Sequence, residues 1–259
     1  MNIDGVEVLV EGTGAETIVM IHGWPDTYRL WTGTVDALKD RCRCVRFSLP
    51  GFEPGHERRT RTLDELMGFI SRVVDAVAPT GKVTLLLHDW GCVFGYNWYA
   101  RNPQRVKRIV GVDIGDTVSF AASASFVTKL MVAAYQFTLA WAWKRGSPKG
   151  DEMVRSMARK MRCPSDYSVM NAGMTYPYYM TWFGKPSFRD GLQAFEPTVP
   201  FLYLYATRKP FMFHDAAWLE RMRARAGNAV QTFDTGHWIM LAEPARFHQV
   251  VRDWLAAQG

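Results

Sequence analysis

The sequence predicts an α/β fold in which a mostly parallel sheet is flanked by helices and carries a helical insert after the strand that ends near Asp113. Strand-like and helix-like segments alternate through about the first 115 residues, a helical stretch follows, and the alternation resumes near residue 201. Strands that are separated by helices pair in parallel, because a parallel connection needs a crossover of about a dozen or more residues. A chain of 259 residues is long enough for one such domain with an insertion.

The segments before the insert have clear strand or helix patterns. Thr17–Ile21 is an apolar run, as expected of a strand that is buried on both faces of a sheet. Leu63–Val77 has its apolar residues on one helical stripe, and Thr62 with Glu65 predicts a capping box at its start. The other strands are predicted at Glu7–Val10, Cys44–Phe47, Val83–Leu87 and Val106–Val112, and the other helices at Trp31–Leu38 and Val93–Ala100.

The stretch from 117 to 195 is rich in methionine, tyrosine, tryptophan and alanine and is typical of helices. We therefore expect a core of residues 1–116 and 196–259 and a helical cap of residues 117–195. Such a cap would cover the carboxyl edge of the sheet, where parallel sheets place their sites. After the cap, strands are predicted at Phe201–Tyr205 and Ala229–Phe233, and helices at Ala216–Ala226 and Pro244–Ala257.

The composition is that of a folded globular protein, with 48% hydrophobic residues and a formal net charge of +6. Basic clusters at Arg155–Arg162 and at Arg221, Arg223 and Arg225 lack interleaved aromatic residues, so we interpret them as solvated helix faces and expect no nucleic-acid partner. The chain start has no signal-like segment and no apolar run reaches about 18 residues, so no membrane span is expected. Four cysteines without metal-binding spacing favour reduced thiols in a cytoplasmic protein, and we expect neither a metal nor a cofactor.

The predicted strand Val83–Leu87 is followed by His88 and then by Asp89. After Asp89 come Trp90, a glycine and a helix-like segment. This is the placement of a nucleophile elbow, in which a tight turn lifts one side chain out of the sheet edge. The N-terminus of the following helix favours a negative charge there. A carboxylate in that position can attack an sp³ carbon and form an ester that water then cleaves. The alternative is that Asp89 only caps the helix.

His237 lies in Gly236-His237-Trp238, between the last predicted strand and the closing helix. Hydrolases with an elbow have the nucleophile first and the histidine last, so we predict that His237 is the general base. Such a histidine needs an acid to orient it. The turn after Phe201–Tyr205 offers Lys209 where an acid would be expected. We therefore predict Asp113, at the end of the preceding strand, and keep Asp116 as the alternative.

The first long strand is followed by the glycine-containing turn His22-Gly23-Trp24-Pro25. Such a turn can aim the backbone N–H of Trp24 at the same point as the N–H of Trp90, and two donors of this kind stabilise a negative oxygen. The alternative is a plain turn at the end of a strand. Because the turn occurs together with the elbow, we predict an oxyanion site at Trp24 and Trp90.

These three motifs resemble those of the α/β-hydrolase superfamily, in the branch with an aspartate nucleophile that contains epoxide hydrolases and haloalkane or haloacetate dehalogenases. The resemblance covers essentially the whole chain and implies the α/β-hydrolase fold, with Asp89 opening an epoxide and His237 activating water. It also implies that two cap tyrosines protonate the departing oxygen. By position, these tyrosines would be Tyr135 and either Tyr176 or Tyr178.

The chain departs from the family's pattern at Leu87, where a small residue is usual, and at Lys209, which replaces the commoner acid. The tyrosines favour an epoxide, because its oxygen needs a proton, whereas a halide leaves as an anion and needs N–H donors. The indoles of Trp24 and Trp90 are such donors, so a haloalkane or haloacid dehalogenase is the first alternative. The second is a non-catalytic binding protein that keeps the pocket. The expected partner is a small apolar organic molecule, and the chain is compatible with a homodimer.

Overall fold

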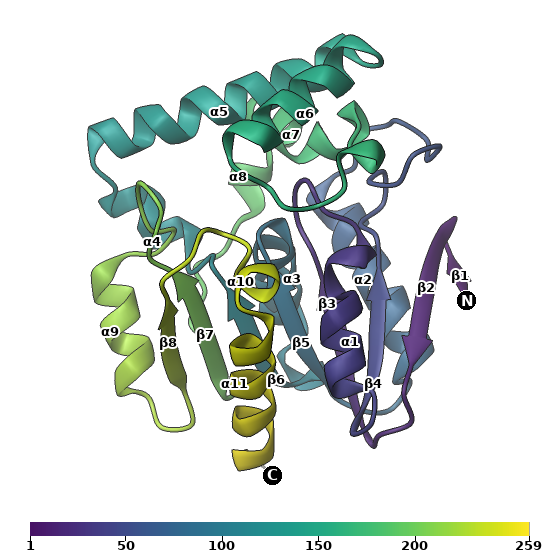
Figure 1. The fold of residues 1–259 in the computed structure, drawn as a ribbon, viewed down its shortest axis with the longest axis vertical. Helices are drawn as coiled ribbons and strands as arrows, with labels where there is room; N and C mark the ends of the chain where they lie inside the picture. Colours follow the sequence, from purple (N-terminus) through teal and green to yellow (C-terminus); the bar gives the residue numbers. More distant parts are fainter. Residues whose placement is uncertain (259) are drawn as a thin grey trace.

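A computed structural model describes residues 1–258 and contains one eight-stranded sheet in the order β1-β2-β4-β3-β5-β6-β7-β8 (Figure 1). Strands β3 to β8 pair in parallel, whereas β1 and β2 pair antiparallel at one edge, so the predicted mostly parallel sheet is confirmed. The strands are β1 (Asn2–Ile3), β2 (Val6–Glu11), β3 (Glu16–Ile21), β4 (Cys42–Phe47), β5 (Val83–His88), β6 (Val106–Val112), β7 (Phe201–Ala206) and β8 (Ala229–Phe233).

Helices cover both faces of the sheet. Figure 1 shows α1 and α11 side by side on one face, with α2 and α3 on the other. The capping box predicted at the start of α2 is confirmed, because Thr62 Oγ1 accepts from the N–H of Glu65 at 3.2 Å and Glu65 Oε2 accepts from the N–H of Thr62 at 2.7 Å. The helices outside the insert are α1 (Thr32–Leu38), α2 (Leu63–Val77), α3 (Trp90–Arg101), α9 (Ala216–Ala224), α10 (Ile239–Ala242) and α11 (Pro244–Ala257).

Between β6 and β7 the chain forms a helical insert, which we define as residues 117–195. In Figure 1 this insert lies above the ends of the strands, with the long helix α5 across the top of the molecule. Within residues 1–258, none of the helices combines the length and the apolarity that a bilayer crossing requires. The helices of the insert are α4 (Thr117–Ser123), α5 (Phe126–Arg145), α6 (Lys149–Lys160), α7 (Tyr176–Phe183) and α8 (Phe188–Gly191).

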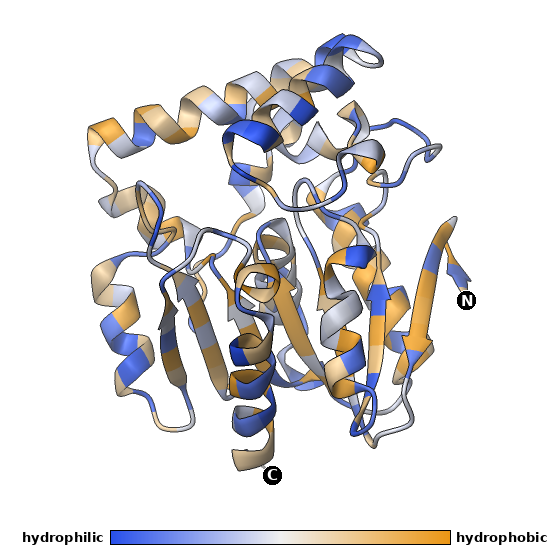
Figure 2. Cartoon of the chain, in the orientation of Figure 1, coloured by the Kyte–Doolittle hydropathy of each residue, from blue (hydrophilic) through white to orange (hydrophobic). Residues whose placement is uncertain are grey.

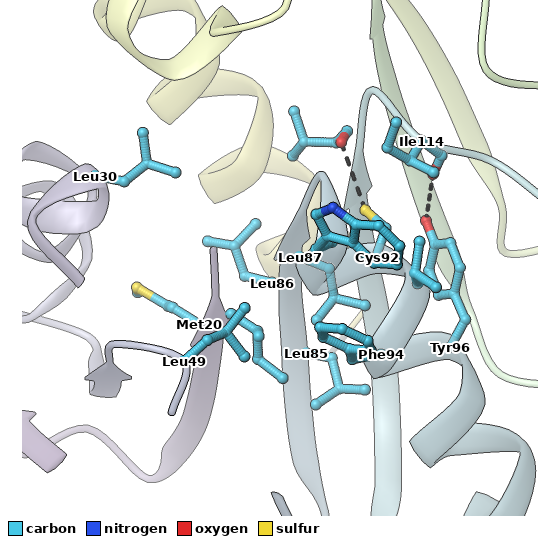
Figure 3. Packing of buried hydrophobic residues seen from close by; sticks show 14 of the residues in the cluster. Met20, Leu30, Leu49, Leu85, Leu86, Leu87, Cys92, Phe94, Tyr96 and Ile114 are labelled. Carbon is cyan, nitrogen blue, oxygen red and sulfur yellow. Dashed lines mark hydrogen bonds between the residues drawn. The ribbon is translucent and has the colours of Figure 1, made fainter. Parts of the chain in front are cut away.

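The core is centred on β5, in which every residue is buried. This strand lies between β3 and β6 and has helices on both sides, which explains its largely apolar sequence. Figure 3 shows the leucines of β5 packed among Met20 and Phe94. In the same view, Tyr96 Oη donates to the backbone oxygen of Ile114 at 2.9 Å and Cys92 Sγ contacts that of Val112 at 3.5 Å. These contacts fix α3 against the end of β6.

Candidate active site

The turn between β5 and α3 holds Asp89 in an unusual backbone conformation, with φ 55° and ψ −123°. Residues other than glycine rarely adopt a positive φ, and such strain persists only where the surroundings enforce it. The turn also packs closely against the end of β3, because a Cβ at Gly91 would lie 2.0 Å from the backbone oxygen of Ile21. The bulk of Leu87 is accommodated opposite Gly95, where a Cβ would lie 2.5 Å from Leu87 Cδ2. The elbow therefore keeps its shape despite the large residue at Leu87.

The two oxygens of the Asp89 carboxylate have different neighbours. Oδ1 accepts from the backbone N–H of Trp24 at 2.7 Å, and Oδ2 lies 3.4 Å from His237 Nε2. Burial raises the pKa of Asp89, but hydrogen bonding and the charge of His237, helped by the N–H of Trp90, outweigh burial and hold the pKa below its usual value. Because its pKa is lowered, the Asp89 carboxylate is ionised, and its side chain is 17% exposed.

His237 connects Asp89 to a second carboxylate. Its Nδ1 donates to Asp113 Oδ2 in a short hydrogen bond, and this orients Nε2 toward Asp89. Burial lowers the pKa of His237, but the charges of Asp113 and Asp89 and their hydrogen bonds raise it to about 9. Asp113 is completely buried directly after β6, also with a positive φ, of 71°. The structure thus brings together the three residues for which the sequence predicted a nucleophile, a base and an acid.

Asp116, the alternative acid, has other partners. Its carboxylate caps α4 by accepting from the N–H of Ser119 at 2.9 Å, and it accepts from the N–H of Phe195 at 3.0 Å. Asp116 is four residues beyond the end of β6, where the chain has already turned into α4. The geometry therefore places Asp113, and not Asp116, beside the imidazole of His237.

Lys209 lies in the turn after β7, where the sequence had suggested the loss of an acid. Its ammonium group contacts Asp113 Oδ1 at 2.6 Å, and the Lys209 side chain is only 8% exposed. Burial raises the pKa of Asp113, but the charges of Lys209 and His237 lower it to about 2. Because β6 and β7 are neighbours, a side chain from the end of either strand reaches the same place. Lys209 is therefore the buried counter-ion of Asp113.

Two of the three predicted tyrosines lie close to the elbow. The ring of Tyr178 is 5.3 Å from that of Trp90 and 5.9 Å from that of Trp24, and the ring of Tyr135 is 6.2 Å from that of Tyr178. Burial, and then the negative charge of Asp89, raise the pKa of both phenols well above the usual value. Both hydroxyls are therefore protonated at neutral pH and can donate a hydrogen.

Tyr176 faces elsewhere. It is two residues from Tyr178 on α7, and positions two apart on a helix point to opposite sides. Its ring packs against Phe52 and Trp143, and its buried hydroxyl has no hydrogen-bond partner among the described residues. Of the two alternatives for the second tyrosine, the structure therefore brings Tyr178, and not Tyr176, to the elbow.

Two side chains that the sequence did not single out support the base. His88 Nε2 donates to the backbone oxygen of His237 at 3.2 Å, and burial lowers the pKa of His88 to about 3, so this ring stays neutral. Asp26, directly after the first motif, accepts from Trp238 Nε1 at 2.9 Å and from the hydroxyl of Ser165 in the insert. Asp26 therefore joins the helical insert to the loop that carries the base. Position alone gives no sign of these partners, because they are 139 or more residues apart.

Comparison with known proteins places these motifs in a family. The model of the alpha/beta hydrolase family matches residues 18–250. A cis-3-alkyl-4-alkyloxetan-2-one decarboxylase from Xanthomonas campestris pv. campestris is 32% identical over 40% of this chain and 37% of its own length. A haloalkane dehalogenase from Agrobacterium fabrum is 30% identical over 48% of this chain and 41% of its own length. Epoxide hydrolase 1 from Caenorhabditis elegans is 24% identical over 92% of this chain and 64% of its own length.

The match therefore spans only about two fifths of the Xanthomonas relative, at 37% of its length. Among solved structures, an epoxide hydrolase from Bacillus megaterium superposes with a TM-score of 0.72 at 16% identity, over 99% of both chains. A thermophilic esterase from Thermogutta terrifontis superposes equally well, with a TM-score of 0.72 at 15% identity, over 98% of this chain and 93% of the esterase. These likenesses establish the fold and leave the reaction to the chemistry of the site. The chain belongs to the α/β-hydrolase family.

Proposed function

We propose that this protein is a hydrolase that opens a small apolar epoxide to a vicinal diol, with Asp89 as the nucleophile. The observation that carries the proposal is the carboxylate in the elbow, which contacts the N–H of Trp24 at 2.7 Å and lies 3.4 Å from His237. A serine hydrolase would present a hydroxyl at this position, whereas a carboxylate forms an alkyl ester with an sp³ carbon. The named activities of the Bacillus and Caenorhabditis proteins agree with this chemistry.

In the first step, Asp89 Oδ2 attacks a ring carbon of the epoxide and the C–O bond of that carbon breaks. The departing oxygen takes a proton from a phenol, for which Tyr178 and Tyr135 are the candidates because both lie near the elbow and remain protonated. Oδ1 becomes the carbonyl oxygen of the ester and stays on the N–H of Trp24. General acid assistance of this kind typically contributes about 10²- to 10⁴-fold in rate.

In the second step, His237 Nε2 takes a proton from water, and the hydroxide attacks the carbonyl carbon of the ester. The bond between that carbon and the alkyl oxygen then breaks, and the departing alkoxide takes the proton from His237 and leaves as the diol. The proton of the new carboxyl group returns to the tyrosine that donated one in the first step, which restores the Asp89 carboxylate. The N–H groups of Trp24 and Trp90 stabilise the negative charge that develops on Oδ1, as an oxyanion site does. Ester formation also removes the negative charge of Asp89, which is one of the causes of the high pKa of His237. The imidazole therefore loses its proton more readily once the ester has formed, which is when a base is needed.

Halide displacement is the second candidate, and one observation favours it. The indole Nε1 of Trp24 is buried and has no hydrogen-bond acceptor in the described structure. A buried N–H without an acceptor is costly, and a leaving halide would satisfy it. The relative named as a haloalkane dehalogenase gives this candidate further support. The same nucleophile and base would serve both reactions.

The proposal is tested by trapping the ester in a His237→Gln variant. Without its base, the variant should accumulate an adduct that intact-protein mass spectrometry detects and peptide mapping assigns to Asp89. An epoxide panel should give adducts equal to the whole epoxide mass, whereas haloalkanes would give adducts lighter by HX if halide displacement is the reaction. The panel also contains a cis-3,4-dialkyl oxetan-2-one, the compound class named for the Xanthomonas relative.

The control for this trap is the double variant Asp89→Asn with His237→Gln, which should form no adduct with any compound. Adducts on another residue, or none with every compound while the wild-type protein is also inactive, would reject the covalent mechanism and leave a binding protein. Turnover by wild-type protein of one compound class then identifies the substrate class.

A methyl group at Gly23 should damage the site without touching the core. A Cβ there would lie 2.2 Å from Asp89 Oδ1 and 2.3 Å from the backbone nitrogen of Trp90. Gly23→Ala must therefore displace the carboxylate or its N–H donors, and we expect turnover to fall by about 10²-fold or more. The matched control is Gly33→Ala, where the nearest atom is 3.7 Å away and turnover should be unchanged. Steady-state kinetics of both variants would contradict the proposed oxyanion site if their losses were equal.

A further inference from the structure

Helix α5 carries an exposed apolar face on the outside of the insert. Phe126, Leu130, Ala134, Phe137 and Trp141 follow one another at intervals of four, four, three and four residues, which places them on one side of the helix. The exposed fraction is 80% for Phe126, 60% for Leu130 and 45% for Trp141. Orange segments recur along α5 in Figure 2, where this helix lies across the top of the molecule. We call these five residues the α5 outer face.

The opposite side of α5 is apolar as well. Tyr135, Leu139 and Ala142 face inward, where α5 packs on α6 and α7. An ordinary surface helix is polar on its solvent side, and a helix that is apolar all round is covered on both sides. The aromatic and aliphatic groups of the α5 outer face expose an area on the order of 500 Å², which is in the upper part of the range for the largest patch on a monomer, and such patches are often functional.

The charges on helix α5 itself are all positive. Helix α5 contains Lys129, Lys144 and Arg145 and no acidic residue. Lys144 Nζ lies 5.5 Å from the ring centre of Trp141, at the end of the apolar stripe. On the neighbouring segment after α7, Lys185 and Arg189 add two further cations beside one carboxylate, Asp190.

We propose that the α5 outer face binds the surface of an anionic phospholipid bilayer. Aromatic and aliphatic side chains flanked by cations are the chemistry of an interfacial helix, whose apolar side enters the headgroup boundary while lysine and arginine contact the phosphates. Attachment is peripheral, since none of the described helices can cross a membrane. The proposal does not depend on the reaction at Asp89.

A second copy of this chain fits the face less well. In a two-fold contact between antiparallel α5 helices, Lys129 of one copy would approach Lys144 and Arg145 of the other. The helix has no carboxylate to neutralise them. An isologous interface is self-complementary only if such like-charge contacts are avoided. The bilayer instead supplies negative charge along the whole face.

The test is sedimentation of the full chain with phosphatidylcholine vesicles that contain either none or about 30 mol% phosphatidylglycerol. Binding should require the anionic lipid and should fall in high salt, because screening shortens the range of the attraction. Replacing two cations in Lys129→Gln with Lys144→Gln should weaken partitioning by about tenfold or more, at roughly 1 kcal/mol per cation. Phe126→Ser with Leu130→Ser should weaken it at least as much, since both side chains project into solvent and contribute little to folding.

The matched control is Lys82→Gln, an exposed lysine outside the face, which should leave partitioning unchanged. Thermal unfolding checks that each variant is folded. Sedimentation that is absent, or equal with and without phosphatidylglycerol, overturns the proposal. A dimer in solution that the Phe126→Ser, Leu130→Ser variant converts to a monomer also overturns it, and would assign the face to a second copy.

Discussion

Replacing Asp89 by asparagine is expected to lower turnover by about 10⁴-fold or more, because an amide cannot form the alkyl ester. The fold should persist. Asparagine tolerates a positive φ better than most residues, and it has nearly the same shape as the aspartate that adopts φ 55° here. Its amide oxygen can still accept from the N–H of Trp24. The loss is therefore assigned to chemistry once circular dichroism and thermal unfolding match the wild type.

An isotope experiment distinguishes this role from a purely electrostatic one. If water attacks the ester carbonyl, a single turnover in ¹⁸O-labelled water places the label in the Asp89 carboxylate, and the diol receives an unlabelled oxygen from Asp89. Direct attack of activated water on the epoxide would place the label in the diol. Mass spectrometry of the Asp89 peptide and of the diol reads both sites. Label in the diol after one turnover would remove Asp89 from the role of nucleophile.

Asp116→Asn is the matched control for this substitution. Asp116 is another buried carboxylate near the end of β6, but it caps α4 and does not contact His237. We expect its replacement to change helix-cap stability little, because asparagine and aspartate cap helices about equally well, and turnover should stay within a few-fold of the wild type. A loss of turnover as large as that of Asp89→Asn would show that the acid at the base had been misassigned.

Local patterns in the sequence predicted the central part of the fold. The apolar run of β5 and the capping box of α2 depend on neighbouring residues, and both lie where the sequence indicated. Strand β1 was not predicted, because its two residues, Asn2 and Ile3, are too few to show a pattern. The largely apolar sequence of β5 reflects its place inside the sheet, with β3 and β6 on either side.

The details of the site depended on contacts that sequence position does not show. Position at the strand end favoured Asp113 over Asp116, but only the chain direction after β6 shows that Asp116 turns away to cap α4. Tyr176 and Tyr178 differ by half a helical turn, which a residue count cannot resolve without the orientation of α7. In the sequence, Lys209 suggested that the usual acid had been lost. Its contact with Asp113 could not be foreseen, because the two residues are 96 positions apart in the chain. Replacement of the usual acid by a cation makes sense only beside a carboxylate on the neighbouring strand.

Asp113→Asn is expected to reduce both turnover and stability. Turnover should fall by about 10³- to 10⁴-fold, because asparagine neither fixes the tautomer of His237 nor stabilises its protonated form. The free energy of unfolding should fall by roughly 3–5 kcal/mol, because the variant leaves the ammonium group of Lys209 buried without a negative partner. Denaturant titration and steady-state kinetics measure the two effects separately.

The double variant Asp113→Asn with Lys209→Met separates these two roles. Methionine fills a similar volume without a charge, and removing both members of a buried ion pair is often nearly neutral for stability. We therefore expect most of the lost unfolding free energy to return, while turnover stays as low as in Asp113→Asn. If turnover recovered together with stability, Asp113 would be only the structural partner of Lys209, and another group would have to orient His237. If neither recovered, the ion pair would not be the source of the instability. The two measurements thus show separately whether Asp113 supports catalysis through His237 and whether it supports stability through Lys209.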